Sequence, residues 1–476
     1  MSDPTYDYIV CGGGTAGCLM ANRLSLDKTK RVLLIEAGGN DDYLWVHIPI
    51  GYLYCIGNPR TDWLYKTEPD PGLNGRQLIY PRGKVMGGCS SINGMIYMRG
   101  QARDYDGWGA GDGFGVNPGW SWAECLPHFM KHEDFHKGAD AVHGAAGFDP
   151  TGARVGGEWR VEKQRLRWDI LDAFAQAAQQ AGIAATDDFN RGDNEGVGYF
   201  EVNQKAGVRW NAAKAFLRPA LRNRQNLQVW TGAQISRVLI EPGADGPRAV
   251  GVEVIPAGGG AREQACVNAQ GGEVILCTGA IGTPQILQLS GIGEPAALQA
   301  LGIEVRKALP GVGANLQDHL QIRAVFGVRG AKTLNTMTQS IWGKALIGLE
   351  YLLKRSGPMS MAPSQLGAFA RSDAGQQHAN VQYHVQPLSL DAFGSPLHTY
   401  PAFTASVCNL NPTSRGAVRL RSPEPTQAPS IAPMYLSTDA DRRVAANSLR
   451  LTRRIAAQPA LAPFQPKEVK PGVQFQ

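Results

Sequence analysis

Residues 8–36 contain the pattern that most restricts how this chain can fold. The apolar stretch Tyr8–Cys11 predicts a short buried strand, and the glycine-rich turn Gly12–Gly17 follows it directly. Residues 18–26 predict a helix, and the apolar residues 31–35 predict a second strand that ends at Glu36. A strand, glycine turn, helix, strand and acidic residue in this order indicate a βαβ unit that binds a dinucleotide.

Each glycine of this turn has a separate physical task. Gly12 permits the tight turn, Gly14 lets the main chain approach a pyrophosphate, and Gly17 lets the helix pack closely on the strand. The pyrophosphate would lie at the helix N-terminus, where free N–H groups favour negative charge. Glu36 is placed to accept hydrogen bonds from ribose hydroxyls. The pattern alone does not separate FAD from NAD, and a glycine-rich turn without a ligand is the alternative interpretation.

Composition argues against several other classes of protein. The net charge is +6 and the charges are dispersed, so we expect no nucleic-acid partner. None of the eight cysteines forms a CxxC pair, which favours reduced thiols and a cytoplasmic location. The N-terminus lacks the features of a signal peptide, and no stretch of about 18 apolar residues predicts a membrane span. The high glycine content, 58 of 476 residues, suits a main chain that approaches an extended ligand closely.

Two further stretches are informative. Residues 81–95 contain four glycines among apolar residues, which excludes a regular helix and suits a loop that follows a flat, hydrogen-bonding ring system. Residues 273–280 predict a strand that enters a turn, and Thr283-Pro284 predicts the start of a helix that ends at Ser290-Gly291.

These two stretches resemble the paired signatures of the glucose–methanol–choline oxidoreductases. The resemblance runs from about residue 6 to near residue 476, and other stretches fit the family in the same order. They are Asp62-Trp63, Tyr97-Met98-Arg99-Gly100, Phe216-Leu217-Arg218-Pro219, Asn226-Leu227, residues 311–319 and Ser414-Arg415-Gly416.

The resemblance implies an α/β fold, α+β overall, with a Rossmann-like FAD-binding domain and a substrate-binding domain built on an antiparallel sheet. We expect the FAD-binding domain to comprise residues 1–158 and 195–311. The substrate-binding domain would then comprise residues 159–194 and 312–476.

The resemblance also implies which residues bind FAD. Some relatives attach the flavin through a histidine, but Ile92 stands at that position here, so noncovalent FAD is expected. The ADP half would lie on the first glycine turn, the flavin on residues 85–95, and the adenine near the main chain of residue 235. The implied cofactor-binding residues are Gly12, Gly14, Thr15, Ala16, Gly17, Glu36, Ala37, Val85, Asn93, Gly94, Met95, Ile235, Thr278 and Gly279.

Catalytic residues are not identified from the sequence. In the family they lie in a C-terminal segment with a His-x-x-Gly-Thr pattern, and no such pattern occurs before the chain ends at Gln476. We therefore expect the chain to stop before the family's catalytic segment. His384, in the alternating stretch 381–386, faces either a substrate cavity or the surrounding packing, and His319 belongs to a motif that is structural in the family.

The implied reaction is the oxidation of an alcohol to an aldehyde by hydride transfer to the flavin. The electrons would pass to oxygen or to a quinone-type or dye-type acceptor. Two alternatives remain open: an FAD-containing enzyme similar to hydroxynitrile lyases, and a catalytically inactive FAD-binding fragment.

Residues 132–136 match the HExxH zinc pattern. That chemistry needs both histidines on one face of a helix, but Asp134 and Phe135 are poor helix formers and Gly138 follows closely. We therefore expect no metal at this position.

Overall fold

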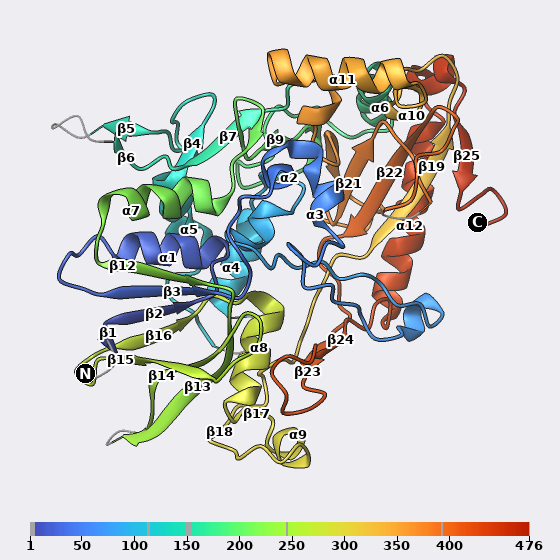
Figure 1. The fold of residues 1–476 in the computed structure, drawn as a ribbon. Coiled ribbons are helices and arrows are strands. Elements are labelled where there is room, and N and C mark those ends of the chain that lie inside the picture. The colour runs from blue at the N-terminus through green and yellow to red at the C-terminus, as the bar shows by residue number, and fades with distance from the viewer. Residues whose placement is uncertain (1–4, 112–114, 149–153, 244–245, 392–393, 476) are drawn as a thin grey trace.

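The computed structural model describes residues 5–111, 115–148, 154–243, 246–391 and 394–475, so the outer bounds of the expected domain segments, residues 1 and 476, lie outside it. A parallel four-stranded sheet carries the first glycine turn (Figure 1). Its strand order is β12 (Leu227–Thr231), β3 (Val32–Glu36), β2 (Tyr8–Cys11) and β16 (Glu273–Leu276). The predicted strand bounds are therefore confirmed to within one residue for β2 and β3.

Both faces of this sheet are buried, because other elements pack on each face and successive side chains point to opposite faces. Val10 and Leu34 pack against α1 (Thr15–Leu24), the π-helical turn η4 (Ala213–Leu217) and α7 (Arg218–Asn223). Ile9 and Leu33 pack against a second sheet on the other face. The second sheet has the order β1 (Thr5–Tyr6), β15 (Glu263–Val267), β14 (Gly246–Pro256) and β13 (Ala233–Gly243).

A six-stranded antiparallel sheet forms the other half of the molecule (Figure 1). Val381, Tyr383 and Val385 of β21 face a large core shared with α6 (Asp169–Gln180) and α12 (Asp439–Ala456). The alternate residues of β21 are polar and face the opposite side. The strand order is β25 (Lys467–Lys470), β19 (Gln321–Gly327), β22 (Ala402–Asn409), β21 (Val381–Gln386), β20 (Leu366–Ala370) and β8 (Gly196–Tyr199).

Shorter elements connect these sheets. In the described residues, no helix is both long enough and apolar enough to cross a bilayer. The helices not yet named are α2 (Leu44–His47), η1 (Pro49–Gly51), α3 (Tyr52–Cys55), η2 (Pro71–Leu73), η3 (Gly88–Ser91), α4 (Ala102–Ala110), α5 (Trp122–His132), α8 (Gly279–Leu289), α9 (Pro295–Ala300), α10 (Leu334–Met337), α11 (Ile341–Lys354), η5 (Pro358–Ser360) and η6 (Pro459–Phe464). The short strands not yet named are β4 (Glu133–Phe135), β5 (Gly147–Phe148), β6 (Arg154–Val155), β7 (Trp159–Lys163), β9 (Glu201–Val202), β10 (Gln204–Lys205), β11 (Val208–Arg209), β17 (Ile292–Gly293), β18 (Lys307–Ala308), β23 (Ala417–Arg419) and β24 (Ser430–Ala432).

The helix predicted to begin at Thr283-Pro284 begins earlier in the structure. Helix α8 starts at Gly279, and Pro284 lies inside it. The hydroxyl oxygens of Thr278 and Thr283 are 3.0 Å apart, so Thr283 bonds across the first turn and does not cap the helix. The prediction was wrong at this point because a Thr-Pro pair is also tolerated one turn inside a helix.

The HExxH match is divided between two elements. His132 ends α5, whereas Glu133 begins the strand β4, so the two histidines do not share a helix face. The side chain of Glu133 is fully buried and forms an ion pair with Arg99, with 2.9 Å between Nη2 and Oε2. His143 Nδ1 lies 3.1 Å from both carboxylate oxygens of Glu133, and its Nε2 lies 2.9 Å from Asp188 Oδ2.

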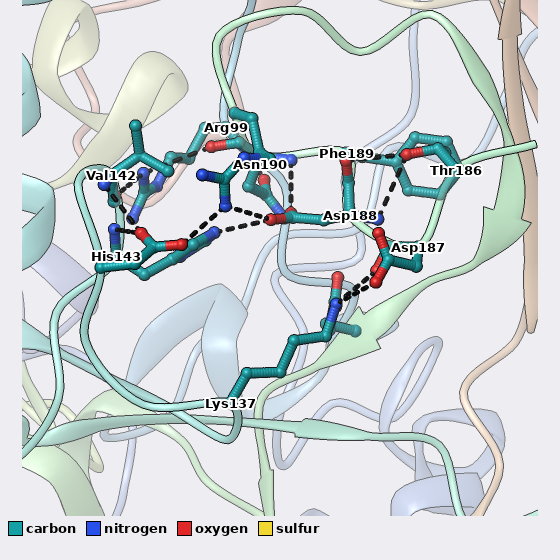
Figure 2. Close-up of polar contacts among 12 residues, drawn as sticks. Arg99, Lys137, Val142, His143, Thr186, Asp187, Asp188, Phe189 and Asn190 are labelled. Atoms are coloured by element: carbon teal, nitrogen blue, oxygen red, sulfur yellow. Dashed lines mark hydrogen bonds and ion pairs between the residues drawn. The ribbon is translucent and has the colours of Figure 1, made fainter.

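This buried cluster of Arg99, Glu133, His143 and Asp188 joins three separate chain segments. Figure 2 shows His143 with Asp188 and Asn190, and with Arg99 nearby. The main-chain N–H of Arg99 also donates to Asn190 Oδ1 at 2.7 Å. Burial alone would lower the pKa of His143, but the hydrogen bonds and charges of Asp188 and Glu133 raise it to about 9. The imidazole is therefore charged at neutral pH and bridges two carboxylates.

We expect this cluster to make stability depend on pH in the alkaline range. An unfolded histidine has a pKa of about 6.5. Because the folded pKa is raised, the stabilisation is complete below about pH 6.5 and is lost as the pH rises through about 9. The substitution His143→Asn should lower the free energy of unfolding by roughly 2–3 kcal/mol at neutral pH, because it leaves buried carboxylates without their cation.

Urea unfolding curves at a series of pH values would measure both effects. The matched control is His128→Asn, which changes an exposed histidine on α5. If the His143→Asn variant and the unmodified chain lost stability equally between neutral and alkaline pH, the cluster would not be the origin of the dependence.

Candidate functional site

A cleft of about 470 Å³ lies where β2, β3 and β16 end. Nine of the residues expected to bind the cofactor line it: Gly12, Gly14, Thr15, Ala16, Glu36, Ala37, Ile235, Thr278 and Gly279. The volume is within the usual range of ~300–1,000 Å³ for small-molecule sites. The carboxyl edge of a parallel sheet is also where open α/β folds bind their ligands.

The glycine turn is held by close main-chain packing. Gly12 has a φ of +97°, and a Cβ added there would lie 2.8 Å from the carbonyl oxygen of Cys277. A Cβ added at Gly17 would lie only 1.8 Å from the Gly12 carbonyl oxygen. These two glycines are therefore required by the protein itself. In contrast, the nearest protein atom to a Cβ at Gly14 would be 3.9 Å away, an ordinary contact, so the fold does not require glycine there.

Two helix N-termini open into the cleft. Thr15 and Ala16 begin α1, and Gly279 and Ala280 begin α8; all four are exposed. Within the described residues, no side chain caps either helix, and neither first turn contains an acid. Each helix therefore presents unoccupied N–H groups and the positive end of its dipole, an arrangement that favours a bound anion such as a diphosphate.

Glu36 fixes the geometry of the turn. Its Oε2 accepts a hydrogen bond from the N–H of Gly13 at 2.7 Å, and its Oε1 accepts one from the N–H of Gly38 at 2.7 Å. Burial raises the pKa of Glu36 to about 7, although the two N–H groups and the charge of Lys84 act in the opposite direction. Each oxygen retains capacity for a second donor, as a ribose hydroxyl would provide.

The second glycine-rich stretch crosses directly over the first. The N–H of Gly87 donates to the carbonyl oxygen of Gly13 at 2.7 Å. A Cβ added at Gly88 would lie 2.7 Å from the Cα of Gly14. Gly88 and Cys89 line the cleft, which therefore lies between the two glycine-rich stretches.

Five of the expected cofactor-binding residues do not line the cleft: Gly17, Val85, Asn93, Gly94 and Met95. Gly17 is the packing position described above. Val85 and Met95 are buried in separate apolar clusters, whereas Asn93 is exposed and its Oδ1 accepts from the main-chain N–H of Met95 at 3.0 Å. Residues 93–95 therefore lie outside the cleft that contains the first glycine turn.

Arg209 is buried beneath residues 90–93. Its Nη1 donates to the carbonyl oxygen of Ser90 at 3.1 Å and to Asn93 Oδ1 at 2.9 Å. Its Nε and Nη2 are buried and have no hydrogen-bond partner within the described residues. Burial lowers the pKa of Arg209 to about 10. Buried donors without partners are costly, so this pair indicates a polar group that is not part of the chain.

The polar face of the six-stranded sheet approaches residues 93–95. Gln386 Nε2 donates to Ser364 Oγ at 3.2 Å, and a Cβ added at Gly94 would lie 3.1 Å from the ring of the adjacent Pro363. Across the strands, Ser406 pairs with His384, and the buried Ser406 Oγ has no hydrogen-bond partner within the described residues. The sheet thus presents polar side chains on the side where Gly94 lies.

The two histidines considered from the sequence occupy different environments. His384 is half-buried on this polar face, with its ring centroid 5.5 Å from that of Phe200. Burial and the nearby charge of His319 lower the pKa of His384 to about 4, so its imidazole is neutral at neutral pH. His319 is exposed, and its Nε2 lies 3.0 Å from the carbonyl oxygen of Leu410.

The cleft also contains Trp63, Tyr65 and Arg82, which the sequence did not assign to cofactor binding. The rings of Trp63 and Tyr65 are stacked, with centroids 5.7 Å apart and an interplanar angle of 6°. Leu64 between them has a φ of +60°, so the chain is not extended there and the one-residue spacing alone gave no signal for the stacked pair.

Models of one protein family match most of the chain. The family is described as GMC oxidoreductase; its N-terminal model matches residues 6–321 and its C-terminal model matches residues 412–475. The expectation that the chain lacks the family's C-terminal segment is therefore not supported. It rested on one short motif, His-x-x-Gly-Thr, whereas the C-terminal model matches a region of which β25 forms the edge strand of the six-stranded sheet.

Curated relatives match over nearly the whole chain. Choline dehydrogenase, mitochondrial, from Homo sapiens is 40% identical over 99% of this chain and 76% of its own length. Oxygen-dependent choline dehydrogenase from Photobacterium profundum is 38% identical over 98% of this chain and 78% of its own length. Alcohol dehydrogenase [acceptor] from Pseudomonas putida is 36% identical over 98% of this chain and 81% of its own length.

Solved structures share the fold. Pyridoxine 4-oxidase from Mesorbium loti superposes with a TM-score of 0.84 at 29% identity, covering 98% of this chain and 84% of that chain. An FAD-dependent oxidoreductase from Chaetomium thermophilum gives a TM-score of 0.83 at 27% identity, covering 99% of this chain and 86% of that chain. The expected α/β fold, with a Rossmann-like part and a substrate part, is confirmed. With both family models matched along it, this chain belongs to the GMC oxidoreductase family.

Proposed function

We propose that this chain is an FAD-dependent oxidoreductase that oxidises the CH–OH group of an alcohol to an aldehyde. The observation that carries the proposal is the cleft in which two uncapped helix N-termini, the first glycine turn and Glu36 converge. Together with membership of the GMC family, this arrangement favours a dinucleotide whose diphosphate contacts main-chain N–H groups.

Three features of the chain fit FAD. The space beside Gly14 is open enough to admit a diphosphate, and the packing of the fold does not itself require a glycine at this position. The unpaired donors of Arg209 lie below residues 90–93, where a second polar group would satisfy them. The stacked rings of Trp63 and Tyr65 form a flat apolar wall on the cleft.

The proposed roles divide the cofactor-binding residues into two groups. Gly12, Gly14, Thr15, Ala16, Gly17, Glu36, Ala37, Ile235, Thr278 and Gly279 would bind or shape the ADP half. Val85, Asn93, Gly94 and Met95 would position the flavin side. In the same division, residues 1–158 and 195–311 form the FAD-binding domain, and residues 159–194 and 312–476 form the substrate-binding domain.

FAD, when bound, accepts the hydride from the alcohol carbon. The chain's own residues bind, orient and enclose the reactants. Ser406 and Gln386, on the polar face of the sheet, offer hydroxyl and amide groups to a substrate held above Gly94. The imidazole of His384 lies on the same face and is neutral, so one of its ring nitrogens can accept a proton or a hydrogen bond from the substrate.

We further propose that the FAD is noncovalent, because Ile92 offers no nucleophile at the position where some relatives carry a histidine. The substrate belongs to the class of alcohols, and the electrons pass to oxygen or to a quinone-type or dye-type acceptor. The choline and alcohol dehydrogenases among the relatives support this class without selecting one alcohol.

The substitution Gly14→Ala should weaken FAD binding without damaging the fold. A methyl group there meets no protein atom closer than 3.9 Å, but it occupies the space proposed for the diphosphate. We expect the dissociation constant for FAD to rise by about 10- to 100-fold, in line with the cost of overpacking a fitted site. Fluorescence titration of the apoprotein with FAD measures this dissociation constant.

The matched control is Gly39→Ala, because a Cβ there has no atom within 4 Å and Gly39 is exposed outside the cleft. Equal affinities in the two variants would refute the diphosphate position.

An anaerobic titration with primary alcohols tests the reaction itself. The purified protein should be yellow, and acid precipitation should release its flavin into the supernatant, since no covalent link is proposed. An oxidisable substrate should bleach the flavin absorbance in the absence of oxygen. A yellow protein whose absorbance no alcohol changes, while it cleaves cyanohydrins, would instead identify a lyase, and a colourless protein after FAD reconstitution would reject the cofactor.

A further inference from the structure

Helix α11 (Ile341–Lys354) exposes an unusually apolar surface. The exposed fractions of its large apolar side chains are 84% for Ile341, 81% for Trp342, 64% for Leu346, 51% for Leu349, 71% for Leu352 and 74% for Leu353. Figure 1 shows α11 along the top edge of the molecule, with no element drawn above it. Single exposed apolar residues are normal, but a contiguous group of this size marks an interaction surface.

The exposed apolar residues occupy the face opposite the attachment of the helix. Ile347 and Tyr351, one turn apart, are buried, and Tyr351 Oη donates to the carbonyl oxygen of Gly207 at 3.0 Å. With about 100° of rotation per residue, the exposed apolar side chains fall within an arc of about 140° on the other side. A helix that is apolar on all sides is normally buried in a core or in a lipid layer.

Basic residues surround this apolar face. Lys344 and Lys354 are exposed on α11, and the exposed Arg355 follows directly with its guanidinium 5.1 Å from the ring centroid of Tyr351. Arg165 lies at the same end, where its Nη2 donates to the carbonyl oxygen of Lys354 at 3.4 Å. Glu350, the one acid within residues 341–355, accepts a hydrogen bond from Ser356 Oγ at 3.1 Å. The rim is therefore cationic.

We propose that α11 docks this protein on an anionic lipid surface, lying parallel to it with the apolar face inserted. The 14 residues of α11 extend about 21 Å, less than the ~30 Å hydrocarbon core of a bilayer, so the helix lies in the interface. Tryptophan and leucine on one side with lysine and arginine at the margins are typical of interfacial helices.

The charges favour a lipid surface over a second copy of the chain as the occupant. In a two-fold contact between antiparallel α11 helices, Lys344 of one helix would lie near Glu350 of the other, but Lys354 and Arg355 would gain no acidic partner from α11, because Glu350 is the one acid within residues 341–355. An anionic lipid surface neutralises all of these cations.

Vesicle flotation of the full chain tests the proposal. The probes are vesicles of equimolar phosphatidylglycerol and phosphatidylcholine, with vesicles of phosphatidylcholine alone as the uncharged comparison. We expect the chain to float with the anionic vesicles. The double variant Leu349→Gln, Leu353→Gln should lower the partition coefficient by about 10-fold or more, because it removes two inserted apolar side chains. Lys344→Gln should lower it by about fivefold.

The matched control is the double variant Leu26→Gln, Leu221→Gln, which changes two leucines exposed elsewhere. It should float like the unmodified chain. The proposal would be overturned if the unmodified chain did not float, or if the Leu349, Leu353 variant floated equally well. A concentration-dependent dimer that this variant abolishes, without vesicle binding, would show that a second copy covers the face. None of these readouts depends on FAD or on turnover, so failure here leaves the proposed function untouched.

Discussion

The contact between the main chains of Gly12 and Gly17 is the constraint on which the rest of the site depends. A side chain at either glycine would collide with main-chain atoms, so β2, α1 and the end of β16 can meet only because both residues lack one. That contact brings the N-terminus of α1 beside the N-terminus of α8. It also places Gly13 within reach of Glu36, whose buried carboxylate is retained by two N–H groups of the chain. The carboxylate and the helix ends thus form one rigid unit.

The six-stranded sheet follows a different physical rule, because its two faces separate packing from polarity. In β21, Val381, Tyr383 and Val385 contribute to the core with α6 and α12. The alternate residues of the same strand carry amide and imidazole groups to the opposite face. A buried polar face is unfavourable unless its groups find partners, and Ser406 has none within the described residues. The Ser406 hydroxyl on this face is therefore available to a ligand, whereas the other face of the sheet contributes to stability through the core.

Local patterns in the sequence predicted the parts of the fold that local physics determines. The strands β2 and β3 and the alternation of β21 were visible because periodicity and glycine placement act over a few residues. The buried cluster of Arg99, Glu133, His143 and Asp188 was not visible, because its members come from distant segments and the HExxH match suggested a different grouping. Similarly, the unpaired donors of Arg209 emerge only once residues 90–93 fold over it.

The chain segment that follows α11 leads from this helix toward residues 93–95. Helix α11 leads into η5 (Pro358–Ser360), and Ser360 accepts a hydrogen bond from Gln204 at 3.0 Å through its carbonyl oxygen. Pro363 then contacts Gly94, which we propose to lie on the flavin side of the site. A surface that binds α11 would therefore be joined to the flavin side by fewer than ten residues of chain. Folding alone would favour polar residues at the six exposed apolar positions of α11, because large apolar side chains are unfavourable in water. Their presence is therefore explained by a function other than folding.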